Sequence, residues 1–183
     1  LLWFIFTVRA EKRAIEPRQY LLTIFTISAL AANALGLPII NQVLQVDKWL
    51  PLADAINRII GYAITVGIVQ ETIKYLVLRF TVWPHNFRTR LDGIAYGVAA
   101  GIGYATVLNL DFIALNAPVT LEAIALRVFG NYALHISTCI IVSYGLAEVR
   151  FSNPNPVFFF FFLAVAALIT GILIPIRAGL VIA

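Results

Sequence analysis

Long apolar stretches separated by short polar connections constrain this chain more than any other feature. Five such stretches cover approximately residues 20–46, 56–82, 92–115, 121–147 and 157–174. A helix needs about 20 apolar residues to cross the hydrocarbon core of a bilayer. Residues 1–8 are too few to span, and we expect them to be the end of a first helix whose beginning is missing. The pattern predicts an all-α, polytopic transmembrane bundle of about six helices, with residues 1–183 forming a single transmembrane domain.

Composition and charge place the chain in lipid. Hydrophobic residues make up 61% of the sequence, charged residues only 12%, and the mean hydropathy is +0.92, whereas soluble domains carry about 25% charged residues. Most basic residues lie in the first, third and fifth connections, which the positive-inside rule assigns to the cytoplasm. We therefore predict an integral membrane protein, surrounded by lipids in a bacterial inner membrane, and no nucleic-acid partner despite the net charge of +4.

The apolar stretch 56–82 holds Gln70, Glu71 and Lys74 in its interior. Glu71 and Lys74 are three residues apart, so they share one face of a helix and can form an ion pair. Such a pair either neutralises the charges so that the helix can insert into the membrane, or belongs to a functional site. Ionisable residues inside a membrane cost free energy and are usually functional. Gln70 is rotated by about 100° from Glu71, so both side chains can line one cavity.

Two further stretches carry ionisable side chains. Asp111 follows Asn109 near the end of the stretch 92–115, where it either reaches the membrane interface or faces a site. His135, inside the stretch 121–147, is either a hydrogen-bonded core residue or a metal ligand or general base. We predict a polar cavity formed by these two helices and the helix that carries Glu71.

Small residues indicate how two of these helices pack. Gly93, Gly97 and Gly101 recur every four residues and so form one helix face, at which a neighbouring backbone can approach closely. The single cysteine, Cys139, has no partner for a disulfide and lies in an apolar run, so we expect a buried, unreactive side chain.

Three segments resemble the PrsW family of membrane-embedded proteases, relatives of the CAAX-processing proteases. VQETIKYL (69–76) is similar to the family's EExxK helix, and Glu71 and Lys74 match its second glutamate and its lysine. LDGIAYGVAAGIGYATVLNL (91–110) is similar to the family's DGxxYGxxxGxGFAxxEN stretch, and HISTCIIVSYGLAE (135–148) to its HxxxT segment. The resemblance implies a helical-bundle protease in which glutamates and a histidine bind zinc, and whose substrates are membrane-anchored proteins.

The chain departs from this pattern at chemically important positions. Gln70 stands where the family has the first glutamate of EExxK, and Leu108 where it has the glutamate of the second motif. Cys139 matches the threonine that follows the histidine. Glutamine is a poor anionic ligand and leucine is no ligand at all. The expected catalytic set is thus reduced to Glu71, His135 and Lys74.

Three functions fit these residues. The first is a PrsW-like pseudoprotease that acts as a binding, regulatory or structural subunit of a membrane complex. The second is an active intramembrane zinc metalloprotease that hydrolyses peptide bonds in membrane-anchored proteins, with a metal held by Glu71, His135 and Asp111. The third is a small transporter or lipid-binding protein, because polar residues at the membrane midplane suit those roles too.

Overall fold

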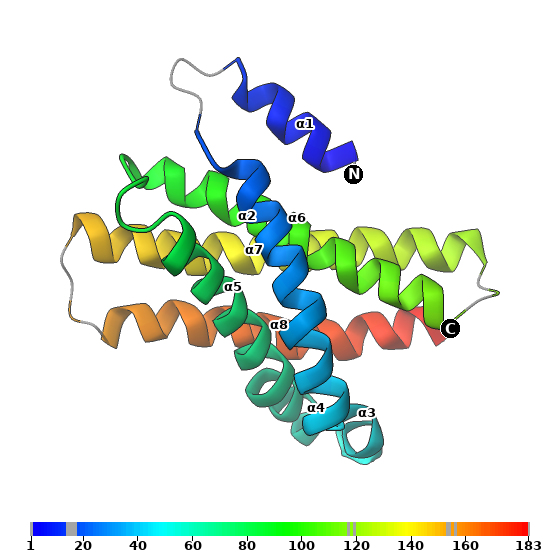
Figure 1. Cartoon of the computed structure of the whole chain (residues 1–183). Helices are drawn as coiled ribbons and strands as arrows, with labels where there is room; N and C mark the ends of the chain where they lie inside the picture. Colours follow the sequence, from blue (N-terminus) through cyan, green and yellow to red (C-terminus); the bar gives the residue numbers. More distant parts are fainter. Residues whose placement is uncertain are drawn as a thin grey trace.

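The structure is a computed structural model that describes residues 2–13, 18–116, 118, 120–152, 155 and 157–182, with side chains described up to residue 176. Within these residues the chain forms six helical segments and no strand (Figure 1). The predicted all-α membrane bundle is therefore confirmed. In chain order the elements are α1 (Leu2–Glu11), α2 (Leu21–Ala31), η1 (Ala32–Gly36), η2 (Ile39–Val43), α3 (Val46–Trp49), η3 (Leu50–Leu52), α4 (Ala55–Tyr62), η4 (Ala63–Gly67), α5 (Ile68–Thr81), α6 (Arg90–Leu115), α7 (Leu121–Phe151) and α8 (Val157–Ile182).

Four helical stretches among the described residues are long and apolar enough to cross a membrane. They cover Leu21–Leu52, Arg90–Leu115, Leu121–Phe151 and Val157–Ile176. The predicted stretch 56–82 is also one continuous helical segment, α4–η4–α5, but it is not one of these four. It carries Glu71 and Lys74 in its interior, and these charged side chains need partners inside the protein.

Three π-helical turns interrupt the regular α-helices. Turns η1 and η2 lie on either side of Pro38, which lacks the backbone donor of a regular helix, and the helix continues through it. The third, η4, directly precedes α5. Single π-helical turns of this kind often occur near functional sites. Two of these turns, η2 and η4, contribute residues to the lining of the cavity described below.

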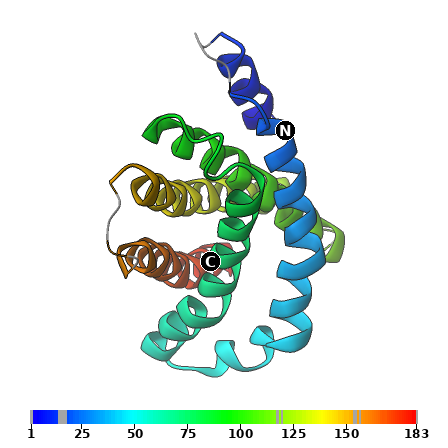
Figure 2. The same ribbon diagram turned by 60° about the vertical axis from the view of Figure 1, so that its left-hand side comes forward.

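Helices α6, α7 and α8 lie side by side as one layer, and α2 and α5 cross it (Figures 1 and 2). The predicted glycine face of α6 makes the contact with α7. A Cβ atom added to Gly101 would lie 2.6 Å from the carbonyl oxygen of His135, and one added to Gly93 would lie 2.8 Å from that of Ser143. Only glycine allows this backbone approach, which fixes His135 relative to α6.

Helix α6 begins at a capping box formed by Thr89 and Asp92. The Asp92 carboxylate accepts hydrogen bonds from the backbone N–H groups of Arg88 and Thr89, each at 2.7 Å, and from Nε of Arg18 at 2.6 Å. Burial opposes the charge of Arg18, but its hydrogen bonds with Glu11 and Asp92 raise its pKa overall. The start of α6 is thereby tied to the segment before α2.

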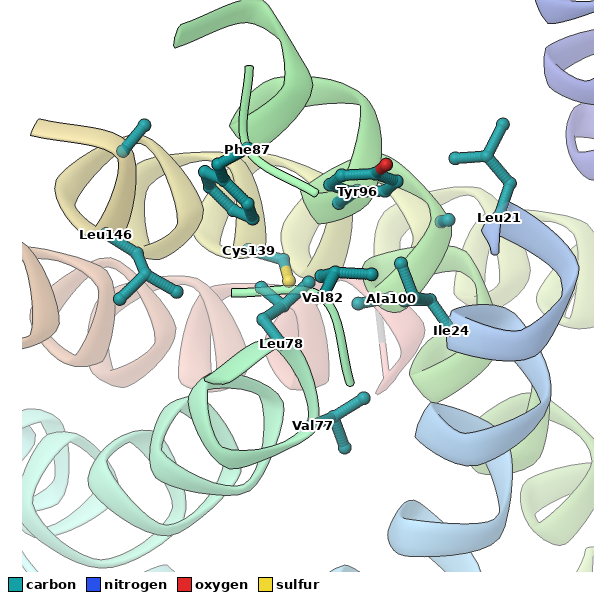
Figure 3. Packing of buried hydrophobic residues seen from close by; sticks show 12 residues of the cluster. Leu21, Ile24, Val77, Leu78, Val82, Phe87, Tyr96, Ala100, Cys139 and Leu146 are labelled. Atoms are coloured by element: carbon teal, nitrogen blue, oxygen red, sulfur yellow. The ribbon is translucent and has the colours of Figure 1, made fainter. Parts of the chain in front are cut away.

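A buried apolar cluster from α2, α5, α6 and α7 lies next to the polar residues of the bundle. Figure 3 shows Ile24, Leu78, Ala100 and Cys139 pointing into this cluster. Cys139 is fully buried, as the sequence predicts. The cluster fixes α5 against α7, and thus sets the position of Lys74 relative to His135.

Candidate functional site

A buried ion pair lies at the centre of the bundle. Nζ of Lys74 lies 2.6 Å from Oε1 of Glu71, and neither side chain is exposed. The two residues are one helical turn apart on α5, as their spacing allows. A buried charge without a partner would cost several kcal/mol, so each residue depends on the other.

Helix α7 completes the surroundings of the ammonium group. Lys74 Nζ donates a hydrogen bond to Oγ1 of Thr138 at 2.9 Å and lies 3.5 Å from Nδ1 of His135. An ammonium group has three donors and no acceptor. Acceptor oxygens of Glu71 and Thr138 and a ring nitrogen of His135 therefore surround it. We call these four residues the Lys74 cluster.

Two residues from other helices border the Lys74 cluster. The Thr170 hydroxyl of α8 lies 3.4 Å from Oε1 of Glu71. The ring of Tyr104 on α6 is 5.4 Å from the ring of His135 and 5.7 Å from Nζ of Lys74, each measured to the ring centroid. Four helices thus enclose the cluster. The second carboxylate oxygen of Glu71, Oε2, is buried and has no hydrogen-bond partner among the residues that the structure describes.

A cavity of about 380 Å³ lies on another side of His135. Its polar lining comes from η2, α3, α4, α5, α7 and the end of α6, and α8 adds Ile174. The lining residues that carry polar or ionisable groups are Asn41, Asp47, Tyr62, Gln70, Asp111, Asn116, Arg127, Asn131 and His135. Gln70, Asn131 and His135 are buried and form its inner end, whereas Asp47 and Asn116 are exposed and mark its mouth.

The structure separates residues that the sequence places together. Gln70, Leu108, Asp111 and His135 line the cavity, whereas Glu71 and Lys74 do not. The rotation of 100° between adjacent helical positions is enough to put Gln70 in the cavity wall and Glu71 in the closed interior. His135 belongs to both regions.

Three contacts were not expected from the sequence. The hydroxyl of Thr138 accepts a hydrogen bond from Lys74, one residue before the expected match at Cys139. Its spacing of three from His135 puts it on the same helix face and was a usable signal. Thr170 lies 99 positions from Glu71 and gives no local signal. Tyr104 resembles a core aromatic residue in the sequence.

Comparison with known proteins now defines the class. Residues 16–174 match the protein family described as PrsW family intramembrane metalloprotease. This match covers most of the chain, so the chain belongs to the PrsW family, as the three segments indicated. No solved structure matches the chain significantly.

Several bacterial proteins named Protease PrsW are similar in sequence. The protein from Bacillus subtilis (strain 168) is 29% identical over 87 residues, which are 47% of this chain and 38% of that protein. The protein from Geobacillus kaustophilus is 27% identical over 142 residues, which are 75% of this chain and 57% of that protein. The protein from Clostridioides difficile (strain 630) is 27% identical over 169 residues, which are 88% of this chain and 68% of that protein. The chain thus spans about half the length of the first two relatives.

Membership of a metalloprotease family raises the question of whether these residues fit a catalytic metal. A catalytic zinc usually has three protein ligands. Oε2 of Glu71 is a buried oxygen that could ligate a metal and has no hydrogen-bond partner within the described part of the chain, and His135 lies close to the same lysine. Among the described residues, however, no group of three His, Cys, Asp or Glu side chains converges. Lys74 also places a positive charge between Glu71 and His135, so in this arrangement the residues do not fit a zinc ion.

Proposed function

We propose that this chain is a member of the PrsW family that binds a segment of another membrane protein without hydrolysing it. The supporting observation is the Lys74 cluster: the ammonium group occupies the space between Glu71 and His135 that a shared metal ion would need. In this proposal the ion pair is structural, and the cavity beside it is the binding site. The partner and the bacterial inner membrane as location belong to the same proposal.

The two substituted positions support a loss of hydrolysis. Gln70 and Leu108, where the resemblance expects glutamates, both line the cavity. Glutamates at these positions would add two carboxylates next to His135, which is also part of the lining. With glutamine and leucine, the cavity keeps its shape and loses the anionic ligands.

A second candidate is an active metalloprotease with a relocated carboxylate. Asp111 lies one helical turn beyond Leu108, and it lines the same cavity as His135. In this candidate Asp111, His135 and Glu71 together hold zinc, which requires Glu71 to turn away from Lys74 and towards the cavity. Lys74 and Glu71 would then act in catalysis instead of stabilising the fold.

Zinc content separates the two candidates. The parent chain and a double variant, Gln70→Glu with Leu108→Glu, are purified in detergent from cells grown with added zinc. Elemental analysis then measures the zinc content per chain of each protein. We expect little zinc in the parent and nearly one ion per chain in the double variant. A matched control, Gln42→Glu with Leu110→Glu, places the same substitutions at exposed positions. Stoichiometric zinc in the parent, lost on His135→Ala, would overturn the proposal in favour of the second candidate.

A further inference from the structure

The cavity wall contains polar atoms that the described protein leaves unsatisfied. Gln70 is 4% exposed, it lines the cavity, and its Oε1 has no hydrogen-bond partner. A buried acceptor of this kind normally costs free energy unless a ligand or water donates to it. This atom points to a ligand that carries N–H or O–H groups.

The charges of the lining indicate the sign of that ligand. Asp47 and Asp111 contribute two carboxylates, and Arg127 contributes the one cationic side chain among the residues that line the cavity. The Arg127 guanidinium stacks at 4.2 Å over the ring of Phe112, and its charge balances only one carboxylate. The lining therefore carries an excess negative charge near the mouth, which favours a cation there.

A row of polar side chains along one wall of the cavity points to a peptide. Arg127, Asn131 and His135 follow each other every four residues along α7, so they form one polar row about 12 Å long. Three or four extended residues span that distance. A lipid chain at this depth would leave Gln70 Oε1 facing hydrocarbon, whereas a peptide backbone supplies N–H groups along its whole length.

We infer that this cavity binds a short extended peptide segment that carries an ammonium group, which pairs with Asp111 at the mouth while a backbone N–H donates to Gln70. This inference rests on the proposed function and specifies its partner as a segment with a lysine or a free amino terminus. The second carboxylate, Asp47, lies at the exposed end and attracts the same charge.

The test measures binding of a short acetylated and amidated alanine–valine peptide with one lysine and an uncharged fluorophore to the full chain in nanodiscs. The matched peptide has norleucine in place of lysine, and a third has norleucine but a free amino terminus. We expect the lysine peptide to bind the parent at least about tenfold more tightly than the norleucine peptide, because a charge-assisted hydrogen bond is lost. The third peptide decides whether the ammonium group can come from a chain terminus.

Variants locate the binding. Asp111→Asn should weaken the lysine peptide about tenfold and leave the norleucine peptide unchanged, whereas Arg127→Gln should strengthen the lysine peptide because it removes the competing cation. Gln70→Leu should weaken both peptides. The exposed carboxylate of Glu122 provides the control, and Glu122→Gln should change neither. Size-exclusion profiles of all variants establish that they remain folded.

Two outcomes overturn the inference. One is equal binding of the lysine and norleucine peptides. The other is competition for the cavity by phosphatidylethanolamine vesicles, sensitive to Asp111→Asn, without peptide binding, which would identify a lipid headgroup as the ligand. Cleavage of the bound peptide would instead contradict the proposed function and leave the peptide site intact, so the two failures are distinguishable.

Discussion

Gln70 and Glu71 are adjacent on α5, yet they belong to two regions with opposite properties. Glu71 lies in the Lys74 cluster, which four helices enclose and in which a carboxylate, an ammonium group and a hydroxyl contact one another. Gln70 faces a cavity, and its side-chain oxygen has no partner. The contrast teaches that one helix can carry a face that neighbouring helices enclose and a face that lines a cavity, so that either can change while the other is kept.

The largest effect on stability is expected when the Lys74 cluster loses its cation. Lys74→Ala leaves Glu71 buried and unpaired, and we expect the free energy of unfolding to fall by about 3–5 kcal/mol. Unfolding in mixed micelles, followed by circular dichroism, measures the change. Lys12→Ala, at an exposed lysine, should change it by less than about 0.5 kcal/mol. A small loss for Lys74→Ala would mean that the pair is not structural.

A smaller effect is expected from the hydroxyl that accepts a hydrogen bond from Lys74. Thr138→Val removes the acceptor and keeps the shape, so we expect a loss of about 1.5–3 kcal/mol, as for hydrogen bonds to charged groups. Thr138→Ser keeps the hydroxyl and should retain most of the stability. If serine and valine variants are equally stable in the same unfolding assay, the hydrogen bond contributes nothing.

The smallest effect on stability is expected in the cavity. Gln70→Leu removes an amide whose oxygen is unpaired, so the unfolding free energy should change by no more than about 0.5 kcal/mol or rise. Its neighbour provides the comparison, because Glu71→Leu leaves Lys74 unpaired and should resemble Lys74→Ala. Equal losses at positions 70 and 71 would remove the distinction between the two regions.

The sequence predicted the helices and part of the site because those features depend on local spacing. Apolar stretches defined the helical segments, the four-residue spacing of glycines predicted a close-packing face on α6, and a spacing of three paired Glu71 with Lys74. The family resemblance was also confirmed.

Other features depend on packing between distant segments and could not be predicted. The contact between Thr170 and Glu71 joins positions 99 residues apart. Asp47 lies in a segment far from the motifs, and Arg127 lies eight residues before His135 on α7, yet both line the cavity. We expected Gln70 and Glu71 to line one cavity, whereas α7 and α8 cover the side of α5 that carries Glu71. Helical spacing gives the angle between two side chains, but it does not reveal which neighbouring helix each one meets.

The central claim is that the Lys74 ammonium, and not a metal ion, occupies the space between Glu71 and His135. The most direct test is the unfolding temperature of the parent with added zinc and with a chelator, because an ion that binds only the folded state must raise it. The account predicts the same temperature in both conditions, and a zinc-dependent rise in the variant that carries Gln70→Glu and Leu108→Glu. A parent that zinc stabilises and a chelator destabilises would contradict it.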